Sequence, residues 1–222
     1  MIELQNITKI YDIGEVKVAA LNDVSFSCEK GEFISIMGHS GSGKSTMMNV
    51  LGCLDRPTSG SYLIDGQDVS KLNDDQLATM RNNKLGFVFQ SYNLLPKLSA
   101  AANVELPLIY AGTNHRHQRA MEVLEAVGIA QRAHHRPSEM SGGEQQRVAI
   151  ARALINDPLV ILADEPTGNL DTAMSHNIMT LLTEQSKKGI TIIVVTHEED
   201  IATYTQRTIY LRDGKIVEEK RR

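Results

Sequence analysis

A glycine-rich stretch at residues 38–46 has the composition and spacing of a phosphate-binding loop. It fits the pattern G-x-x-x-x-G-K-[ST] and stands between an apolar run and a helix-compatible run. Glycines permit backbone angles that a β-carbon would block, so backbone N–H groups can surround an anion at the start of the helix. Lys44 adds a mobile charge for the outer phosphates, and the Ser45 hydroxyl is a suitable Mg²⁺ ligand. The predicted ATP-binding residues here are Gly38, His39, Ser40, Gly41, Ser42, Gly43, Lys44, Ser45 and Thr46.

Four polar residues follow apolar, strand-like runs, and their chemistry suits phosphoryl transfer. Asp164 is the expected second Mg²⁺ contact, and Glu165 can orient or deprotonate an attacking water. His197 can hold the γ-phosphate and that water, while Gln90 offers an oxygen to the metal and an amide to the water. Each residue alone is equally well explained as a satisfied polar group at a sheet edge. Their joint placement around one phosphate loop favours a catalytic role.

The runs that end at these residues predict the core of the fold. Residues 33–37, 85–90, 159–163 and 190–196 are continuously apolar or nearly so, which is typical of parallel strands buried on both faces. The carboxyl ends of such strands form the ligand edge of an open α/β sheet. Strands alternating with helices therefore predict a parallel sheet with right-handed crossovers. Helices are expected at about 46–54, 74–81, 144–156 and 177–188.

Antiparallel structure is predicted elsewhere in the chain. Residues 1–37 read as β-structure, and a hairpin is expected about residues 65–66. A second hairpin, turning at residues 213–214, would end the chain. Tyr11 is expected in a loop, where by itself it would be a half-buried surface tyrosine.

Helical signals dominate from residue 91 to residue 140. Residues 100–111 are helix-like, and Pro107 predicts a kink or break there. A second helix is expected over about 115–127, capped by a residue at 113–114. We interpret this region as an inserted helical subdomain.

Length and composition limit the class of protein. The chain has 222 residues, 41% hydrophobic and 23% charged, which suits one α/β domain, with or without a subdomain. The formal net charge of −4 does not favour a nucleic-acid partner. The longest apolar runs are of strand length, and the first residues lack the pattern of a secretory signal. Cys28 and Cys53 are expected to be reduced, as in a cytosolic protein.

Further motifs resemble those of a known protein family. Residues 140–147 (Met-Ser-Gly-Gly-Glu-Gln-Gln-Arg) resemble the signature motif of ABC ATPases. Residues 164–171 (Asp-Glu-Pro-Thr-Gly-Asn-Leu-Asp) resemble their Walker B motif running into the D-loop. In this resemblance His197 matches the switch histidine, Gln90 the Q-loop, and Tyr11 the aromatic that stacks on adenine. The resemblance covers nearly the whole chain, and the motifs occur in the family's order.

This resemblance implies a fold, α/β, and a mechanism. The fold is a P-loop NTPase of ABC type, with a mainly parallel core sheet, an antiparallel β-subdomain and an inserted α-helical subdomain. One ABC ATPase domain would span 1–222, with 1–90 and 141–222 forming the core with the β-subdomain and 91–140 the helical subdomain. Two such domains would meet head to tail as a homodimer, or as a heterodimer with a similar subunit, with each ATP between one P-loop and the partner's signature. The implied nucleotide-contacting residues of that second surface are Ser141, Gly142, Gly143 and Asp171.

Two positions depart from the common signature. Met140 and Glu144 stand where many members have leucine and glutamine. An acid near a triphosphate could weaken closure of the dimer. A modest effect is expected because Glu144 can point away from the phosphate.

A narrower resemblance concerns the membrane partner. Residues 89–96, 103–108 and 165–171 look like those of lipoprotein-releasing and macrolide or peptide export ATPases. Such ATPases work with a permease that has few transmembrane helices and a large extracytoplasmic domain, and they transmit motion across the membrane. Residues 90–108 would then hold a groove for the permease's coupling helix, although some apolar residues there must be ordinary core. The chain would lie in the cytoplasm, on the inner face of the cell membrane. The alternative is an ABC ATPase that regulates a membrane signalling or cell-division complex without transport.

Overall fold

Two β-sheets enclose helix α1 (Lys44–Leu51) in the computed structural model, which describes residues 1–14 and 16–222. The core sheet has the order β10-β9-β3-β8-β7-β6, and all its neighbours are parallel except β10. This confirms the predicted parallel sheet. Its strands are β3 (Phe33–Met37), β6 (Leu85–Phe89), β7 (Val160–Asp164), β8 (Thr191–Val195), β9 (Arg207–Arg212) and β10 (Lys215–Arg221).

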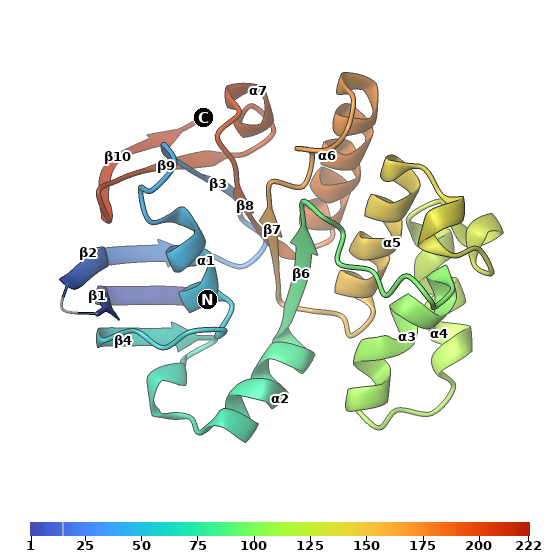
Figure 1. Ribbon diagram of the computed structural model, residues 1–222, viewed down its shortest axis with the longest axis horizontal. Helices are drawn as coiled ribbons and strands as arrows, with labels where there is room; N and C mark the ends of the chain where they lie inside the picture. The colour runs from blue at the N-terminus through green and yellow to red at the C-terminus, as the bar shows by residue number, and fades with distance from the viewer. Residues whose placement is uncertain (15) are drawn as a thin grey trace.

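The second sheet is antiparallel and has the order β2-β1-β4-β5. It is formed by β1 (Ile2–Ile13), β2 (Val16–Cys28), β4 (Ser59–Ile64) and β5 (Gln67–Asp68), and lies on the left of Figure 1. The predicted hairpin at residues 65–66 is confirmed, and both residues have positive φ. The loop predicted at Tyr11 is wrong, because Tyr11 pairs with Val18 and the strand continues through it.

Alternate residues of the core strands face two different hydrophobic clusters. On β8, Ile192 and Val194 pack with the helices α3 to α6, whereas Ile193 and Val195 pack with α1 and the antiparallel sheet. Side chains alternate between the two faces of a strand, so a strand covered on both faces must be apolar throughout. This explains why the predicted core strands read as continuous apolar runs.

The helical region lies on the right of Figure 1, where α3, α4 and α5 gather beside β6. Its elements are α3 (Ala100–Tyr110), α4 (Arg116–Ala126), α5 (Gly142–Leu154) and the 3₁₀ turns η2 (Ala130–Arg132) and η3 (Pro137–Glu139). Helix α3 continues through Pro107, so the predicted break is wrong, whereas the predicted kink stays a prediction. Only the last turn of α3 follows Pro107, and little helix remains to disrupt. The predicted cap at 113–114 is also wrong. The chain enters α4 through a left-handed residue, His115, and no side chain caps the helix.

Three further helices complete the chain. They are α2 (Asp74–Lys84), α6 (Thr172–Lys187) and α7 (Glu199–Ala202), with a 3₁₀ turn η1 (Val69–Lys71) before α2. Helix α6 begins five residues before the predicted start at residue 177, because the Asp171 side chain accepts a hydrogen bond from Met174 N and caps it. Within the described residues, no helix combines the length and the apolar character needed to span a bilayer. The predicted division into core and helical subdomains at residues 90 and 140 stays a prediction.

Candidate functional site

A cleft of about 1140 Å³ opens at the carboxyl edge of the core sheet, and it brings together most of the predicted site residues. Sequence positions more than 150 residues apart meet there, because β3, β7 and β8 are neighbours in the sheet. Ser42, Tyr11 and Asp171 are not among the lining residues, and neither are residues 141–143. The predicted residues that line the cleft are Gly38, His39, Ser40, Gly41, Gly43, Lys44, Ser45, Thr46, Gln90, Asp164, Glu165 and His197.

The phosphate loop is held in shape by strands from both sheets. Gly43 has a φ of 104°, and a β-carbon there would lie 2.5 Å from the carbonyl oxygen of Ala20 on β2. A β-carbon at Gly38 would overlap the carbonyl oxygen of Leu211 on β9. Gly214 N donates a hydrogen bond to Ser42 O at 2.9 Å, a typical distance. Close packing therefore requires glycine at positions 38 and 43, and the backbone angle requires it at position 43 as well.

The start of α1 leaves hydrogen-bond donors free for an anion. Its N-cap is Gly43, which has no side chain, so no side-chain oxygen takes the first amides of the helix. Lys44 Nζ donates to the carbonyl oxygens of Gly38 at 2.6 Å and His39 at 2.9 Å, which folds the ammonium group over the loop. Amide donors, a helix N-terminus and a lysine together fit the phosphates of a nucleotide.

Asp164 is a half-buried carboxylate whose environment favours a cation. Burial raises its pKa, and so does the neighbouring charge of Glu165, while Lys44 lowers it. Because desolvation disfavours the charged carboxylate, a bound cation would relieve that cost. Ser45 and Gln90 line the same cleft and supply neutral oxygens, so this set of residues fits Mg²⁺.

Glu165 is held by two residues that follow β8. Its carboxylate accepts hydrogen bonds from Thr196 Oγ1 at 3.2 Å and lies 2.7 Å from His197 Nδ1. The hydrogen bond and charge of Glu165 raise the pKa of His197. Glu198 also lies near, with possible metal-ligating atoms of the three residues within 4.8 Å of one another. Thr196 was missed from the sequence, although its position beside His197 is the signal that could have found it.

Gln90 follows β6 and lies against the loop after Glu165. A β-carbon at Gly168 would lie 2.5 Å from Gln90 Nε2, so the two residues are in close contact. Asn169 Nδ2 donates to the Gln90 carbonyl oxygen at 2.9 Å, a contact that the sequence did not predict. Gln90 therefore lines the cleft while Asn169 holds its backbone carbonyl.

The predicted signature residues lie outside the cleft, at the start of α5. Ser141 Oγ accepts from Glu144 N at 3.3 Å, and Glu144 Oε2 accepts from Ser141 N at 2.8 Å. Glu144 Oε1 also accepts from Arg132 Nε at 2.8 Å, so its carboxylate is turned toward its own chain. These contacts, first of all the Ser141 backbone N–H, lower the pKa of Glu144. Gly143 packs tightly against Met174 of α6.

Tyr11 lies beside the cleft. Its hydroxyl donates to Asp55 Oδ2 at 2.7 Å, and Lys9 Nζ stands 4.8 Å from its ring centroid. Burial and the hydrogen bond to Asp55 raise the pKa of Tyr11. Its contact with adenine stays a prediction.

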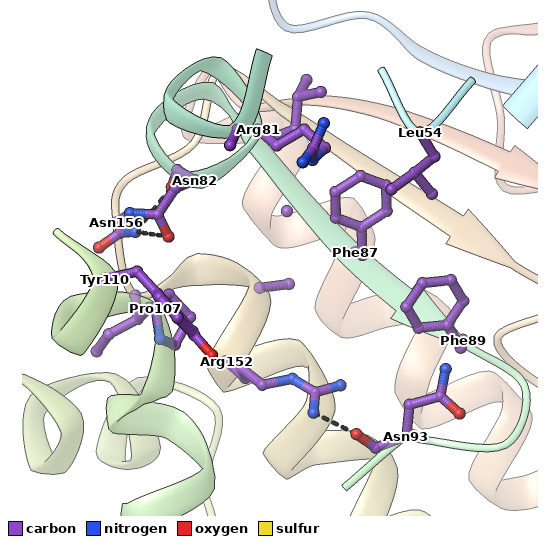
Figure 2. Close-up of a pocket in the computed structure, with 15 residues that line it drawn as sticks. Leu54, Arg81, Asn82, Phe87, Phe89, Asn93, Pro107, Tyr110, Arg152 and Asn156 are labelled. Carbon is purple, nitrogen blue, oxygen red and sulfur yellow. Dashed lines mark hydrogen bonds between the residues drawn. The ribbon is translucent and has the colours of Figure 1, made fainter. Parts of the chain in front are cut away.

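A second hollow of about 570 Å³ lies between β6, α2, α3 and α5 (Figure 2). Phe87 and Phe89 form an aromatic wall, with ring centroids 5.9 Å apart and rings nearly parallel. Arg152 donates to the carbonyl oxygens of Tyr92 and Asn93 at its edge. This hollow shares no lining residue with the phosphate cleft.

Comparison with known proteins gives concordant matches. The sequence profile of the family described as ABC transporter matches residues 21–168. An uncharacterized ABC transporter ATP-binding protein of Thermotoga maritima is 56% identical over 218 residues, which are 97% of this chain and 93% of that protein. The macrolide export ATP-binding/permease protein MacB of Chlorobaculum tepidum is 55% identical over all of this chain, which spans only 34% of MacB. A dimeric structure of the ATP-binding cassette MJ0796, in a post-hydrolysis state with ADP and Pi, matches with a TM-score of 0.91 and 47% identity, covering 100% of this chain and 98% of that one.

Proposed function

This chain belongs to the ABC transporter family of ATP-binding cassettes, and from that premise we propose that two copies share their ATP sites to drive a membrane partner. It is an ATPase, which converts ATP to ADP and phosphate. The proposal of a shared site rests on the position of the signature residues. Residues 141–143 stand outside the cleft that holds the P-loop, so we propose that the signature of a second copy supplies the opposite wall.

The residues of the cleft divide the work of hydrolysis. Loop amides and Lys44 bind the phosphates, while Ser45 and Asp164 would hold Mg²⁺, which neutralises charge on the phosphate oxygens. Glu165 accepts a proton from, or orients, the attacking water. His197 holds the Glu165 carboxylate at 2.7 Å, and its other ring nitrogen, which has no hydrogen bond to the described residues, can meet the γ-phosphate.

The second copy would approach through the start of α5. Ser141 Oγ accepts from Glu144 N, and its hydroxyl also hydrogen-bonds to the Glu144 carboxylate. We propose that this hydroxyl turns to a phosphate oxygen when the second copy closes. Glu144 is bound to Arg132 and to Ser141 N, so its charge is directed away from that phosphate. This arrangement supports a working signature despite the acid at position 144.

A membrane permease is the partner that we propose for the second hollow. Its wall is aromatic, and Leu54 and Tyr110 at its border are 52% and 83% exposed (Figure 2). Arg81 and Arg152 line it and donate to backbone carbonyl oxygens. A cytoplasmic helix with apolar side chains and a carboxylate would match this surface. The MacB relative, named as an ATP-binding/permease protein, supports a permease partner. We further propose that this permease has a large extracytoplasmic domain and that the chain lies on the cytoplasmic face of the membrane.

The test is the size of the Glu165→Gln variant in solution, measured by light scattering with and without Mg-ATP. Loss of the carboxylate should slow hydrolysis and leave binding intact, so a dimer should accumulate only with ATP. Adding Lys44→Ala to this variant is the control, because a chain that cannot hold ATP should stay monomeric. A monomer in all conditions, with ATP bound, would overturn the shared site for this chain alone.

A further inference from the structure

Gln146 is a fully buried polar residue that joins α5 to the loop carrying Glu165. It lies in the second turn of α5, and its side chain has no exposed surface. Its Nε2 donates to the carbonyl oxygen of Pro166 at 2.7 Å. Pro166 follows Glu165 directly, so this hydrogen bond acts one residue from the carboxylate that positions the water.

The loop held by Gln146 is a tight turn. Glu165 has a φ of 45°, in the left-handed region that residues with a β-carbon rarely adopt. Gly168 N donates to Glu165 O at 3.1 Å and closes the turn, while Glu165 N donates to Val195 O at 2.9 Å. The strained residue is therefore tied to β8 on one side, and Gln146 ties the following residue to α5 on the other.

A contribution to stability alone does not explain the hydrogen bond between Gln146 and Pro166. Gln146 Oε1 and Thr167 Oγ1 are both buried without a hydrogen-bond partner in the described part of the chain. A buried polar atom without a partner costs about 1–3 kcal/mol, and an apolar side chain of similar size would avoid that cost. Gln185 Nε2 is also buried without a partner in the described residues, so an unpaired atom alone does not indicate a role. Gln146 differs because it donates a hydrogen bond to the loop that carries Glu165.

We propose that Gln146 is a positioning residue for hydrolysis, which sets the place of Glu165 through the carbonyl of Pro166. It does so from the helix that begins at the signature, so the placement of Glu165 is tied to the surface that meets the second copy. This inference rests on the proposed role of Glu165 in orienting the water.

The test compares steady-state hydrolysis by the intact chain and by Gln146→Met, which keeps the volume and removes the donor. The kcat should fall about tenfold or more, while the KM for ATP stays within about twofold, because the nucleotide contacts are unchanged. The matched control is Gln185→Met on α6, which also removes a buried glutamine and should leave kcat unchanged.

A double variant separates positioning from general damage. If Gln146 acts through Glu165, adding Gln146→Met to Glu165→Gln should lower the single-turnover rate by less than about twofold. The double variant should also still dimerise with ATP. Gln146→Asn, whose side chain is too short for its amide to reach Pro166, should show the same loss in kcat. This variant replaces Gln146→Met in the test if Gln146→Met does not fold.

Three results would overturn the inference. They are an unchanged kcat in folded Gln146→Met, an equal fall in kcat for Gln185→Met, and additive losses in the double variant. A normal rate in Glu165→Gln would instead contradict the proposed role of Glu165 itself, so the two failures are distinguishable.

Discussion

Two helices of this protein begin at glycine-rich turns beside predicted phosphate contacts, yet their N-termini differ. Helix α1 starts after Gly43, a left-handed glycine that offers no side chain to the first amides. Helix α5 starts after Ser141, which forms a reciprocal capping box with Glu144. The donors of α1 are open to an anion, whereas those of α5 are partly used by its own cap.

The residues that surround the two helix N-termini also differ. The start of α1 faces a cleft that already contains Asp164, Glu165 and His197. The start of α5 lies outside that cleft, and its Glu144 is paired with Arg132. We infer that the first terminus binds ATP alone, and that the second adds its contacts only when two copies close around the nucleotide.

The largest expected effect is the loss of ATP binding in Lys44→Ala. A charge-assisted contact with phosphate contributes about 1.5–3 kcal/mol, so the Kd for ATP should rise roughly 100-fold by calorimetry. Lys187→Ala, at the exposed end of α6, is the control and should bind ATP normally. Unchanged affinity in Lys44→Ala would contradict the claim that the first terminus is the binding site.

Ser141→Ala should break closure and spare binding. In the Glu165→Gln background, we expect roughly tenfold more ATP to be needed for half-maximal dimer, because the donated hydroxyl is lost. Monomer affinity for ATP should stay within about twofold. Loss of the cap should also cost about 1 kcal/mol of unfolding free energy.

A cap elsewhere controls for that loss of stability. Ser99 caps α3 by accepting from Ala102 N, so Ser99→Ala should cost a similar free energy of unfolding and leave dimerisation unchanged. Equal effects of the two variants on the dimer would remove the distinction between the termini.

Glu144→Gln should have a smaller effect. Glutamine still completes a capping box, so only the part-exposed pair with Arg132 is lost, at about 0.2–1 kcal/mol. Because the pKa of Glu144 is lowered in the folded chain, this difference should be present at neutral pH and vanish as the solution is acidified through its titration. Thermal melts at several pH values measure it. The ATP requirement for dimerisation should change less than about threefold, and a larger change would mean that Glu144 faces the nucleotide.

The smallest expected effect concerns the ion pair between Glu165 and His197 in the phosphate cleft. The pKa of His197 lies above its ordinary value of 6.5, so its ion pair with Glu165 is present below that pH and lost as pH rises through the raised pKa. Histidine NMR titration should show this pKa falling in Glu165→Gln. An unchanged pKa would mean that the contact at 2.7 Å is not kept in solution.

Much of the fold and site was predictable because the signals are local. Continuous apolar runs identified the parallel strands, and the polar residues that end them, such as Asp164 and His197, were correctly expected at one edge. The errors have different causes. Tyr11 lies in a strand through pairing with Val18, and α6 begins at a cap, Asp171, that the sequence analysis placed in a nucleotide-contacting motif.

The sequence by itself predicted the phosphate loop, the carboxylates of Asp164 and Glu165 at the sheet edge, and the family, because each rests on residue types at short, fixed spacing. Only the tertiary structure decided which helix terminus has free donors, where the Glu144 carboxylate points, and that Gln146 reaches Pro166. Those outcomes depend on hydrogen bonds between residues that are far apart in the chain or on the choice among several local partners. Residue types alone do not specify such choices, because each of these side chains has several possible partners of similar strength.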